Sequence, residues 1–416
     1  MDYLIRTVDR ELDDLLGIAP AVALDGPKGV GKTDTARRRS DVAWYLDDPA
    51  QREVARADFD LSAVDAGTLL IDEWQRLPQV WDAVRRRVDA GAPPGRFLLT
   101  GSATPAGPAG THSGAGRILS VRMRPMGLHE RGVVTPTVSF AGLLSGDAPE
   151  VEGNTSFSLR DYAEVIVGSG FPGIMVAPPR LQRGLLDAYT RRIVDRDLPE
   201  QGLQVRRPET LRRWLAAYAA ASSTTTAYSR LLDATTGGDG TQPAKTTTIT
   251  YRDHLSQLWL LDPVPGWTPA NNPIRRLQQA PKHQLADPAL AAHLLGLSAQ
   301  SLLTAGGAHM MGPLFESLVT LGVRVLAQAA EATVSHLRLG GGEREVDLVV
   351  EGFDGRVLGI EAKLAPAVTD ADVRHLRWLR DQMPDRVVDL VVVTTGTTAY
   401  RRPDGIAVVP LALLGA

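Results

Sequence analysis

The sequence predicts an α/β protein that is divided into three consecutive parts. At both ends of the chain, short apolar runs alternate with helical stretches, which is typical of a sheet covered by helices. The middle of the chain is mostly helical in pattern. With 416 residues, of which 44% are hydrophobic and 22% charged, the chain is long enough for about two or three folded domains.

The composition excludes several classes of protein. A formal net charge of -3 excludes a grossly basic protein that coats nucleic acid. The absence of cysteine excludes disulfides, thiolate metal sites and a cysteine nucleophile. The N-terminus lacks the pattern of a signal peptide, and no uninterrupted apolar run reaches about 18 residues. We therefore expect a cytoplasmic protein that does not enter a membrane.

The first part, residues 1–140, contains four apolar runs that we expect to form a parallel sheet. The expected strands are Ala21–Asp25, Ala43–Leu46, Thr68–Ile71 and Arg96–Thr100. The stretch Ala103–Gly116 is rich in glycine, proline and serine, and we expect it to be a loop. A second loose stretch, Leu144–Ser156, is expected to be a linker to the next part.

A glycine-rich run follows the first expected strand and precedes a helical stretch. It consists of Gly26, Pro27, Lys28, Gly29, Val30, Gly31, Lys32 and Thr33. Backbone amides in such a run can surround phosphate oxygens, and the helix N-terminus adds a favourable dipole. Lys32 would reach the β- and γ-phosphates of ATP, and the Thr33 hydroxyl would ligate Mg²⁺. The alternative is a glycine-rich turn that matches by chance, which the strand and helix context disfavours.

Two carboxylates, Asp72 and Glu73, follow the third expected strand. Ligand chemistry gathers at the carboxyl ends of parallel strands. Asp72 would hold Mg²⁺ through water, and Glu73 would polarise the water that attacks the γ-phosphate. The alternative is a strand that ends in surface acids. Ser102, or its neighbour Thr100, ends the fourth strand and would contact the γ-phosphate from beside the same crevice.

Phosphoryl transfer often uses an arginine that offsets charge. Arg117 is the candidate here, from the same chain or from a neighbouring copy, and Arg124 is the second candidate. A surface arginine without such a role is the alternative for both.

The middle part, residues 157–303, is expected to contain three short helices followed by a hairpin-like return through Leu261–Trp267. The expected helices are Glu209–Ala220, Tyr228–Thr235 and Tyr251–Leu260. This order resembles a winged helix, and a basic cluster stands beside it: Arg206, Arg207, Arg212 and Arg213. Winged helices bind DNA or serve as packing units, and both alternatives remain open.

The third part, residues 310–416, carries a group of acidic residues on expected strands. Alternation along a strand points Glu345 and Asp347 to one face, and the same rule points Glu361 and Lys363 to one face of the next strand. Glu316 lies on the preceding expected helix. Converging carboxylates bind Mg²⁺ and a nearby lysine can activate water. A structural network of salt bridges is the alternative.

The chain resembles prokaryotic ATPases of the AAA superfamily, in the archaeal-ATPase-like branch, whose C-terminal half is a domain of unknown function. The motifs that carry the resemblance are Gly26–Thr33, Leu70–Gln75, Leu98–Ala103, Gly116–Ile118, Phe171–Pro172, Asp195–Asp197, Ala280–His283, Gly312–Glu316, Glu345–Asp347 and Glu361–Lys363. The resemblance implies a P-loop ATPase domain, a central winged-helix-like region and a C-terminal domain that resembles the PD-(D/E)xK nuclease fold. In that fold, Asp347 and Glu361 would be Mg²⁺ ligands, Glu316 an auxiliary ligand and Lys363 the catalytic amine.

These observations predict a Mg²⁺-dependent P-loop ATPase that binds and hydrolyses ATP. We expect an ATP-driven switch that acts on DNA through the nuclease-like domain, with deoxyribonuclease activity if that domain is active. The alternative is a nucleotide-gated regulatory or protein-interaction module whose nuclease-like domain is an inactive scaffold. The expected partners are ATP, ADP and DNA, and the resemblance allows a homo-oligomer.

Overall fold

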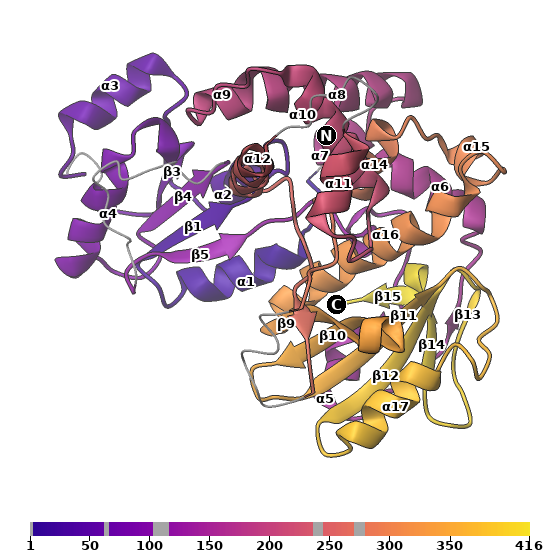
Figure 1. Ribbon diagram of the computed structural model, residues 1–416. Helices are drawn as coiled ribbons and strands as arrows, with labels where there is room; N and C mark the ends of the chain where they lie inside the picture. The colour runs from indigo at the N-terminus through magenta and orange to yellow at the C-terminus, as the bar shows by residue number, and fades with distance from the viewer. Residues whose placement is uncertain (1–2, 62–65, 103–115, 236–243, 270–278) are drawn as a thin grey trace.

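The computed structural model describes residues 3–61, 66–102, 116–235, 244–269 and 279–416. Figure 1 shows a first sheet at one side, a group of helices, and a second sheet, with the long helix α16 (Ala308–Ala329) running between the helices and the second sheet. The loop expected at Ala103–Gly116 lies, apart from Gly116, outside the described residues.

The first sheet has five parallel strands in the order β2-β3-β4-β1-β5. Their bounds are β1 Ala21–Asp25, β2 Val42–Tyr45, β3 Leu69–Asp72, β4 Phe97–Gly101 and β5 Leu119–Arg122. The flanking helices are α1 Thr7–Leu16, α2 Lys32–Arg37, α3 Pro49–Ala57 and α4 Gln79–Asp89. Four strands lie within a residue of the expected ranges. The fifth, β5, was not predicted because it is an edge strand with exposed positions, so it lacks the continuous apolar run of a central strand.

All five strands of this sheet point the same way, so their carboxyl ends share one edge. The glycine-rich run follows β1, Asp72 ends β3, and Ser102 follows β4 at that edge. The fold therefore brings together side chains that lie far apart in the sequence. Apolar residues of β3 and β4 pack against α4 on one face, with Leu69, Ile71 and Val84 fully buried.

The segment expected to be a linker is instead part of the C-terminal architecture. It contains the end of α5 (Phe140–Ser145) and all of β7 (Gly153–Asn154), and β6 (Val138–Ser139) lies shortly before it. Strand β6 pairs with β15 (Leu414–Gly415) near the end of the chain, and β7 pairs with β13 (Thr398–Arg401). The expectation of a linker was wrong because loose composition does not reveal that a short segment completes a distant sheet.

The central region is helical, as expected. Its elements are α6 Leu159–Gly168, α7 Pro172–Met175, α8 Pro179–Arg192, the π-helix η3 Ile193–Asp197, α9 Leu198–Glu200, α10 Pro208–Ala220, α11 Tyr228–Ala234, α12 Lys245–Gln257, α14 Pro288–Leu294 and α15 Ala299–Leu302. The return after α12 makes isolated antiparallel bridges from Leu261 to Leu285 and from Val264 to Lys282. Strand β8 (Gly266–Trp267) then pairs with the second sheet, so this return is not a free wing.

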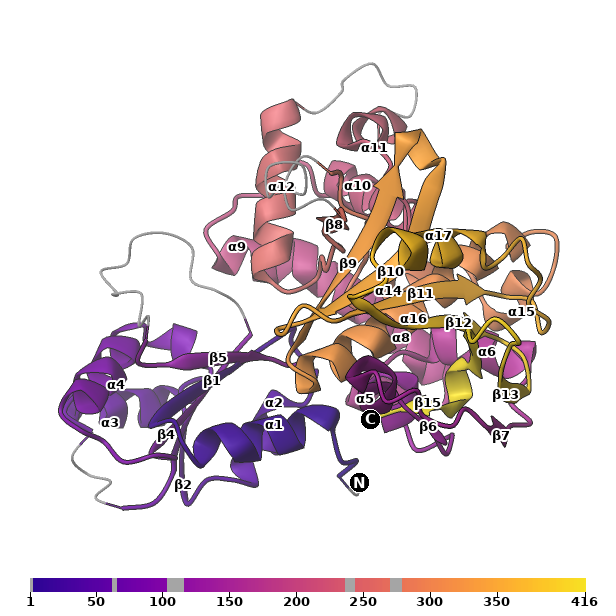
Figure 2. The same ribbon diagram turned by 90° about the horizontal axis from the view of Figure 1, so that it is seen from below.

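The second sheet has eight strands in the order β7-β13-β14-β12-β11-β10-β9-β8. The remaining bounds are β9 Ala332–Leu339, β10 Arg344–Gly352, β11 Val357–Lys363, β12 Val387–Thr394 and β14 Ala407–Pro410. Helix α17 (Arg374–Gln382) packs on β10, β11 and β12, and α16 and α5 also contact this sheet. Figure 2 shows the second sheet and the first sheet on opposite sides of α1 and α16.

Helix α16 is the one helix in the described ranges that is long and apolar enough to cross a membrane, with 22 residues and a mean hydropathy of 1.4 over its apolar stretch. In the structure 78% of that stretch is buried. Leu314, Leu318 and Val319 are fully buried in the main hydrophobic cluster. This burial is typical of a core helix in a soluble protein.

Candidate functional site

The glycine-rich run forms a tight loop between β1 and α2. Gly29 and Gly31 have φ values of 78° and 103°, a left-handed conformation that favours glycine. At Gly26, any Cβ atom would clash with the carbonyl oxygen of Met123 on the neighbouring segment. The loop backbone is therefore possible only with these glycines, and it ends at the N-terminus of α2 as a phosphate site requires.

Lys32 is buried in this loop, with only 5% of its surface exposed. Its Nζ donates hydrogen bonds to the carbonyl oxygens of Gly26 (2.8 Å) and Pro27 (2.9 Å). Burial lowers the pKa of Lys32 to about 8, although the carboxylates of Glu73 and Asp72 act in the opposite direction. The ammonium group is thus held by neutral backbone groups, and an anion could replace them as its partner.

Thr33 and Asp72 lie together, as the sequence predicted. The Thr33 hydroxyl donates to Asp72 Oδ1 at 2.8 Å, and the Thr100 hydroxyl donates to the same oxygen. Burial raises the pKa of Asp72, and these two hydrogen bonds oppose that shift. A hydroxyl and a carboxylate in contact at the end of a phosphate loop are a donor set that fits Mg²⁺.

Glu73 has a left-handed backbone (φ 54°) at the end of β3, an unusual conformation that is found more often at functional sites. Its Oε2 accepts hydrogen bonds from Gln75 Nε2 (2.6 Å) and from the Ser102 hydroxyl (3.0 Å). Sequence reasoning placed Ser102 here but missed Gln75, although Gln75 ends the motif Leu70–Gln75. It also missed Asp25 at the end of β1, where burial raises the carboxyl pKa to about 6.

The phosphate loop also contacts the central region. Lys28 Nζ lies 2.6 Å from Asp197 Oδ1 of η3 and 3.7 Å from Glu200 Oε2 of α9. Arg76, just beyond Glu73, pairs with the same Glu200 at 3.2 Å. Sequence reasoning expected Lys28 in the phosphate loop and named Asp195–Asp197 as a motif of the resemblance, but did not connect the two.

Arg117 does not lie near the phosphate loop. It precedes β5, so it is at the amino edge of the parallel sheet, opposite the loop. Its Nε pairs with Asp89 at the end of α4 at 2.8 Å. The expectation that Arg117 acts on a phosphate of its own chain was therefore wrong, because loop direction could not be read from the sequence. A role of Arg117 toward a neighbouring copy stays a prediction.

Arg124, the second candidate, lies at the carboxyl edge of the first sheet, where the phosphate loop also lies, but it is already paired with a carboxylate. Its Nε lies 2.9 Å from Asp262 Oδ2, and Arg122 and Arg324 pair with the same carboxylate. Burial acts to raise the pKa of Asp262, but the three guanidinium groups outweigh it and hold that pKa well below its usual range. Asp262 therefore ties β5 to the central region and to α16.

Comparisons with known proteins match the chain in three pieces. Residues 19–131 match an AAA domain family, residues 159–301 a domain of unknown function (DUF8612), and residues 311–414 another domain of unknown function (DUF4143). Residues 19–131 form a P-loop ATPase domain of the AAA type. Two proteins described as uncharacterized, from Mycobacterium bovis and Mycobacterium tuberculosis, are each 26% identical over 407 residues, covering 94% of this chain and 80% of theirs.

A solved structure, the Walker-type ATPase of Pyrococcus abyssi, is similar to this chain with a TM-score of 0.40 and 15% identity. The similarity covers 70% of this chain and 96% of that one.

Outside the ATPase domain, the expected acidic residues come together around a lysine. Lys282 Nζ lies 2.9 Å from Glu316 Oε1, 2.9 Å from Asp347 Oδ1 and 3.5 Å from Glu345 Oε1. Lys282 is only 1% exposed, and its segment comes from the central region. Asp347 also connects Lys282 to Glu361, which hydrogen-bonds to Asp347 and pairs with Lys363 at 2.9 Å.

The charges of this cluster are balanced by the protein itself. Burial would lower the pKa of Lys282, but Asp347 and Glu316 outweigh it and raise that pKa. Burial acts to raise the pKa of Asp347, yet Lys282 and Lys363 hold it below its usual value. Burial, followed by the charge of Asp347, raises the pKa of both Glu316 and Glu361, which favours their neutral forms.

The metal site that we expected at Asp347, Glu361 and Glu316 is therefore not formed. Across the described ranges, no group of three or more acidic or histidine side chains is arranged to hold a metal ion. The physical reason is Lys282, whose ammonium group stands where the carboxylates converge and supplies the positive charge that a cation would bring. Its distance in sequence, 34 residues from Glu316 and 65 from Asp347, hid this contact from the sequence analysis.

Proposed function

We propose that this chain is a Mg²⁺-dependent ATP hydrolase that works as a nucleotide-controlled switch, with its C-terminal domain serving as a scaffold and not as a nuclease. The observation that carries the proposal is the convergence of Lys32, Thr33, Asp72 and Glu73 at one edge of a parallel sheet. Each of these four side chains has a distinct task in phosphoryl transfer.

In the proposed reaction, the amides of the loop and Lys32 bind the phosphates of ATP. Thr33 and Asp72 would hold Mg²⁺, which offsets negative charge on the phosphates when it is bound. Glu73 orients the attacking water and accepts its proton. Gln75 and Ser102 fix the Glu73 carboxylate through Oε2, which leaves its second oxygen for the water.

Lys28 supports the proposal of a switch. It is part of the phosphate loop, yet its ammonium group is bound to Asp197 of the central region. A phosphate oxygen in the loop would compete with Asp197 for Lys28, so binding of nucleotide and the position of η3 are coupled. The ring of Pro172 also packs against the loop, within 3.7 Å of the place where a Cβ on Gly31 would stand.

The lysine-filled cluster supports a scaffold role for the C-terminal domain. A nuclease needs carboxylates that are free to bind a cation, whereas Asp347 and Glu316 are bound to Lys282. The basic cluster, for which DNA binding was one of two alternatives, is partly neutralised, since Arg212 pairs with Asp195 and with Glu209. Of the two functions that the sequence predicted, these contacts favour the nucleotide-gated regulatory module.

The proposal is tested by measuring phosphate release from ATP, with Mg²⁺ or with a chelator, together with cleavage of a supercoiled plasmid. We expect Mg²⁺-dependent phosphate release and no plasmid cleavage. Glu73→Gln should keep ATP binding and lose hydrolysis by about 100-fold or more, because the general base is removed. Glu53→Gln, on the exposed surface of α3, is the matched control. Plasmid cleavage that disappears in Lys363→Ala would overturn the scaffold role, and unchanged turnover in Glu73→Gln would overturn the catalytic assignment.

A further inference from the structure

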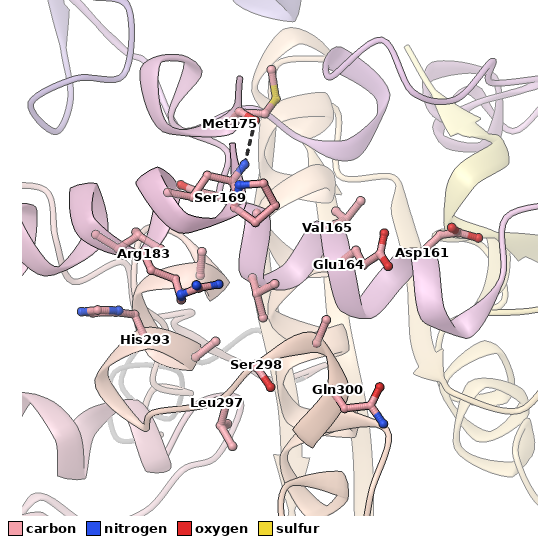
Figure 3. Close-up of a pocket in the computed structure, with 18 of the residues that line it drawn as sticks. Asp161, Glu164, Val165, Ser169, Met175, Arg183, His293, Leu297, Ser298 and Gln300 are labelled. Atoms are coloured by element: carbon pink, nitrogen blue, oxygen red, sulfur yellow. Dashed lines mark hydrogen bonds between the residues drawn. The ribbon is translucent and has the colours of Figure 1, made fainter. Parts of the chain in front are cut away.

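A cavity of about 910 Å³ lies in the central region, away from the ATP site and from the acidic cluster. Its walls come from α6, α7, α8, α14 and α15, and Figure 3 shows the side chains that line it. In Figure 1, α6 and α15 are at the side of the central region that faces away from the first sheet. The volume is within the range of roughly 300–1,000 Å³ that is typical of small-molecule sites.

The walls of the cavity are mainly apolar. The apolar lining includes Val165 and Val167 of α6, Leu186 of α8, Ala292 of α14, and Leu297, which precedes α15. At Gly168, the last residue of α6, an added Cβ would meet no atom within 4 Å. Open space next to apolar side chains favours a ligand with an apolar body, because burial of that body releases water from both surfaces.

One end of the cavity carries a positive charge that is available to a ligand. Arg183 of α8 lines the cavity, and within the described ranges its guanidinium group has no hydrogen bond or ion pair. By contrast, Arg191 on the same helix pairs with Asp187. Figure 3 shows that the Arg183 side chain extends toward the cavity, whereas Glu164 lies toward the other end. This separation of charge would orient a ligand with its anionic group at Arg183.

We propose that this cavity is a binding site for an amphipathic anion, a molecule with a single carboxylate and an apolar chain or ring system. The carboxylate would pair with Arg183, since a guanidinium presents parallel N–H donors that match two carboxylate oxygens. The apolar body would lie along Val165, Leu186 and Leu297. A medium-chain fatty acid represents this chemistry.

The position of the cavity also gives such a ligand a route to the ATP site, and this step rests on the proposed function. Helix α8 lines the cavity and continues directly into η3, whose Asp197 pairs with Lys28 of the phosphate loop. π-helical turns are often found at functional positions in helices. A ligand that shifts α8 would change the Lys28–Asp197 contact, so occupancy of the cavity changes the rate of ATP hydrolysis.

The test compares decanoate, decanol and decylamine by calorimetric titration of the full chain. We expect decanoate to bind most tightly. Arg183→Gln should weaken decanoate by about tenfold, as loss of a charged contact predicts, and leave decanol unchanged. Arg180→Gln is the matched control, because Arg180 is exposed on the same helix and does not line the cavity. Tighter binding of decylamine, or equal loss in both arginine variants, would overturn the proposal.

A second pair of variants tests whether decanoate binds inside the cavity. Gly168→Trp should fill the cavity and abolish decanoate binding, whereas Gly184→Trp, on α8 and also facing open space, should not. Thermal unfolding of both variants shows whether they are folded. Decanoate binding that survives Gly168→Trp in the folded protein would overturn the site. If decanoate binds but ATP turnover does not change, the proposed link between the cavity and the ATP site is wrong. If the protein has no ATP turnover at all, the proposed function fails, while the titration still tests whether the cavity binds decanoate.

Discussion

Two buried lysines show how the same side chain can serve opposite purposes in one molecule. Lys32 in the ATPase domain is 5% exposed, and Lys282 in the acidic cluster is 1% exposed. Lys32 is held by two backbone carbonyl groups, whereas Lys282 is held by the carboxylates of Glu316, Asp347 and Glu345. Burial lowers the pKa of Lys32 to about 8, while the carboxylates raise the pKa of Lys282.

The difference in partners decides which lysine is available for chemistry. Carbonyl groups are neutral, so a phosphate that enters the loop can replace them and gain a charge-assisted bond. Carboxylates in a buried cluster cannot release Lys282 without leaving uncompensated charges in a medium of low polarity. The lysine of the ATPase domain is therefore ready for a ligand, and Lys282, which reaches the acidic cluster from the central region, is a permanent part of the structure.

The largest expected effect is on catalysis. Lys32→Met should lower ATP turnover by at least about 100-fold, because it removes a positive charge that stabilises charge on the transferred phosphoryl group. Stability should change little, since only two backbone contacts are lost. Lys245→Met, at the exposed start of α12, is the control. Turnover measured by phosphate release that stays within twofold of the unmodified chain would contradict the role of Lys32.

The corresponding change in the acidic cluster should affect stability instead. Lys282→Met leaves buried carboxylates without their cation, which typically costs about 3–5 kcal/mol. Denaturant unfolding should show this loss, and the same Lys245→Met variant should not. Combining Lys282→Met with Glu316→Gln and Asp347→Asn should restore part of the stability, because neutral amides need no cation. No recovery in the combined variant would refute the charge-balance explanation.

The contact between the segment of Lys282 and the second sheet should also make the stability of the protein sensitive to acid. Burial lowers the pKa of His336 from 6.5 to about 4; the carbonyl of Ala280 opposes the shift, and Lys282 and Arg338 add to it. A pKa that is lower in the folded state means that stability is complete above pH 6.5 and declines as the pH falls toward 4, by up to about 3 kcal/mol. His336→Gln should reduce this decline in unfolding experiments at several pH values. An identical pH dependence in both proteins would contradict the assignment.

The smallest expected effect concerns the contact between the phosphate loop and the central region. The Lys28–Asp197 pair is partly exposed on the lysine side, so its coupling energy should be at most about 1 kcal/mol without nucleotide. Thermal unfolding of Lys28→Gln, Asp197→Asn and the double variant measures that coupling. With a saturating non-hydrolysable ATP analogue, the coupling should fall toward zero. A coupling that is the same in both states would show that Lys28 does not sense the phosphate.

Local motifs were predictable from the sequence where a single continuous segment determines their backbone conformation. The phosphate loop, the end of β3 and four strands of the first sheet all follow from short patterns of glycine, apolar and acidic residues. Strand β5 and the placement of β6 and β7 did not follow, because short or exposed edge strands lack a continuous apolar run. Pairing with a distant strand is determined by the whole fold.

The candidate sites show the same limit. Alternation along β10 and β11 correctly brought Asp347, Glu361 and Lys363 together, because a strand fixes side-chain direction locally. Lys282, which occupies the centre of the cluster, comes from a separate segment that precedes α14 and makes an isolated bridge to Val264, and no local pattern places it. Arg117 was misplaced for a related reason, since the direction of the chain after Ala103–Gly116 cannot be derived from spacing.

The two lysine sites are distinguished most directly by counting bound Mn²⁺ with electron paramagnetic resonance, with and without a non-hydrolysable ATP analogue. We expect one Mn²⁺ per chain in the presence of the analogue, because Thr33 and Asp72 need the phosphates to complete the site, and none in its absence. The Lys32→Met variant should bind none under either condition. A Mn²⁺ that binds without nucleotide and is lost in Asp347→Asn would contradict the conclusion that Lys282 has taken the place of a metal ion.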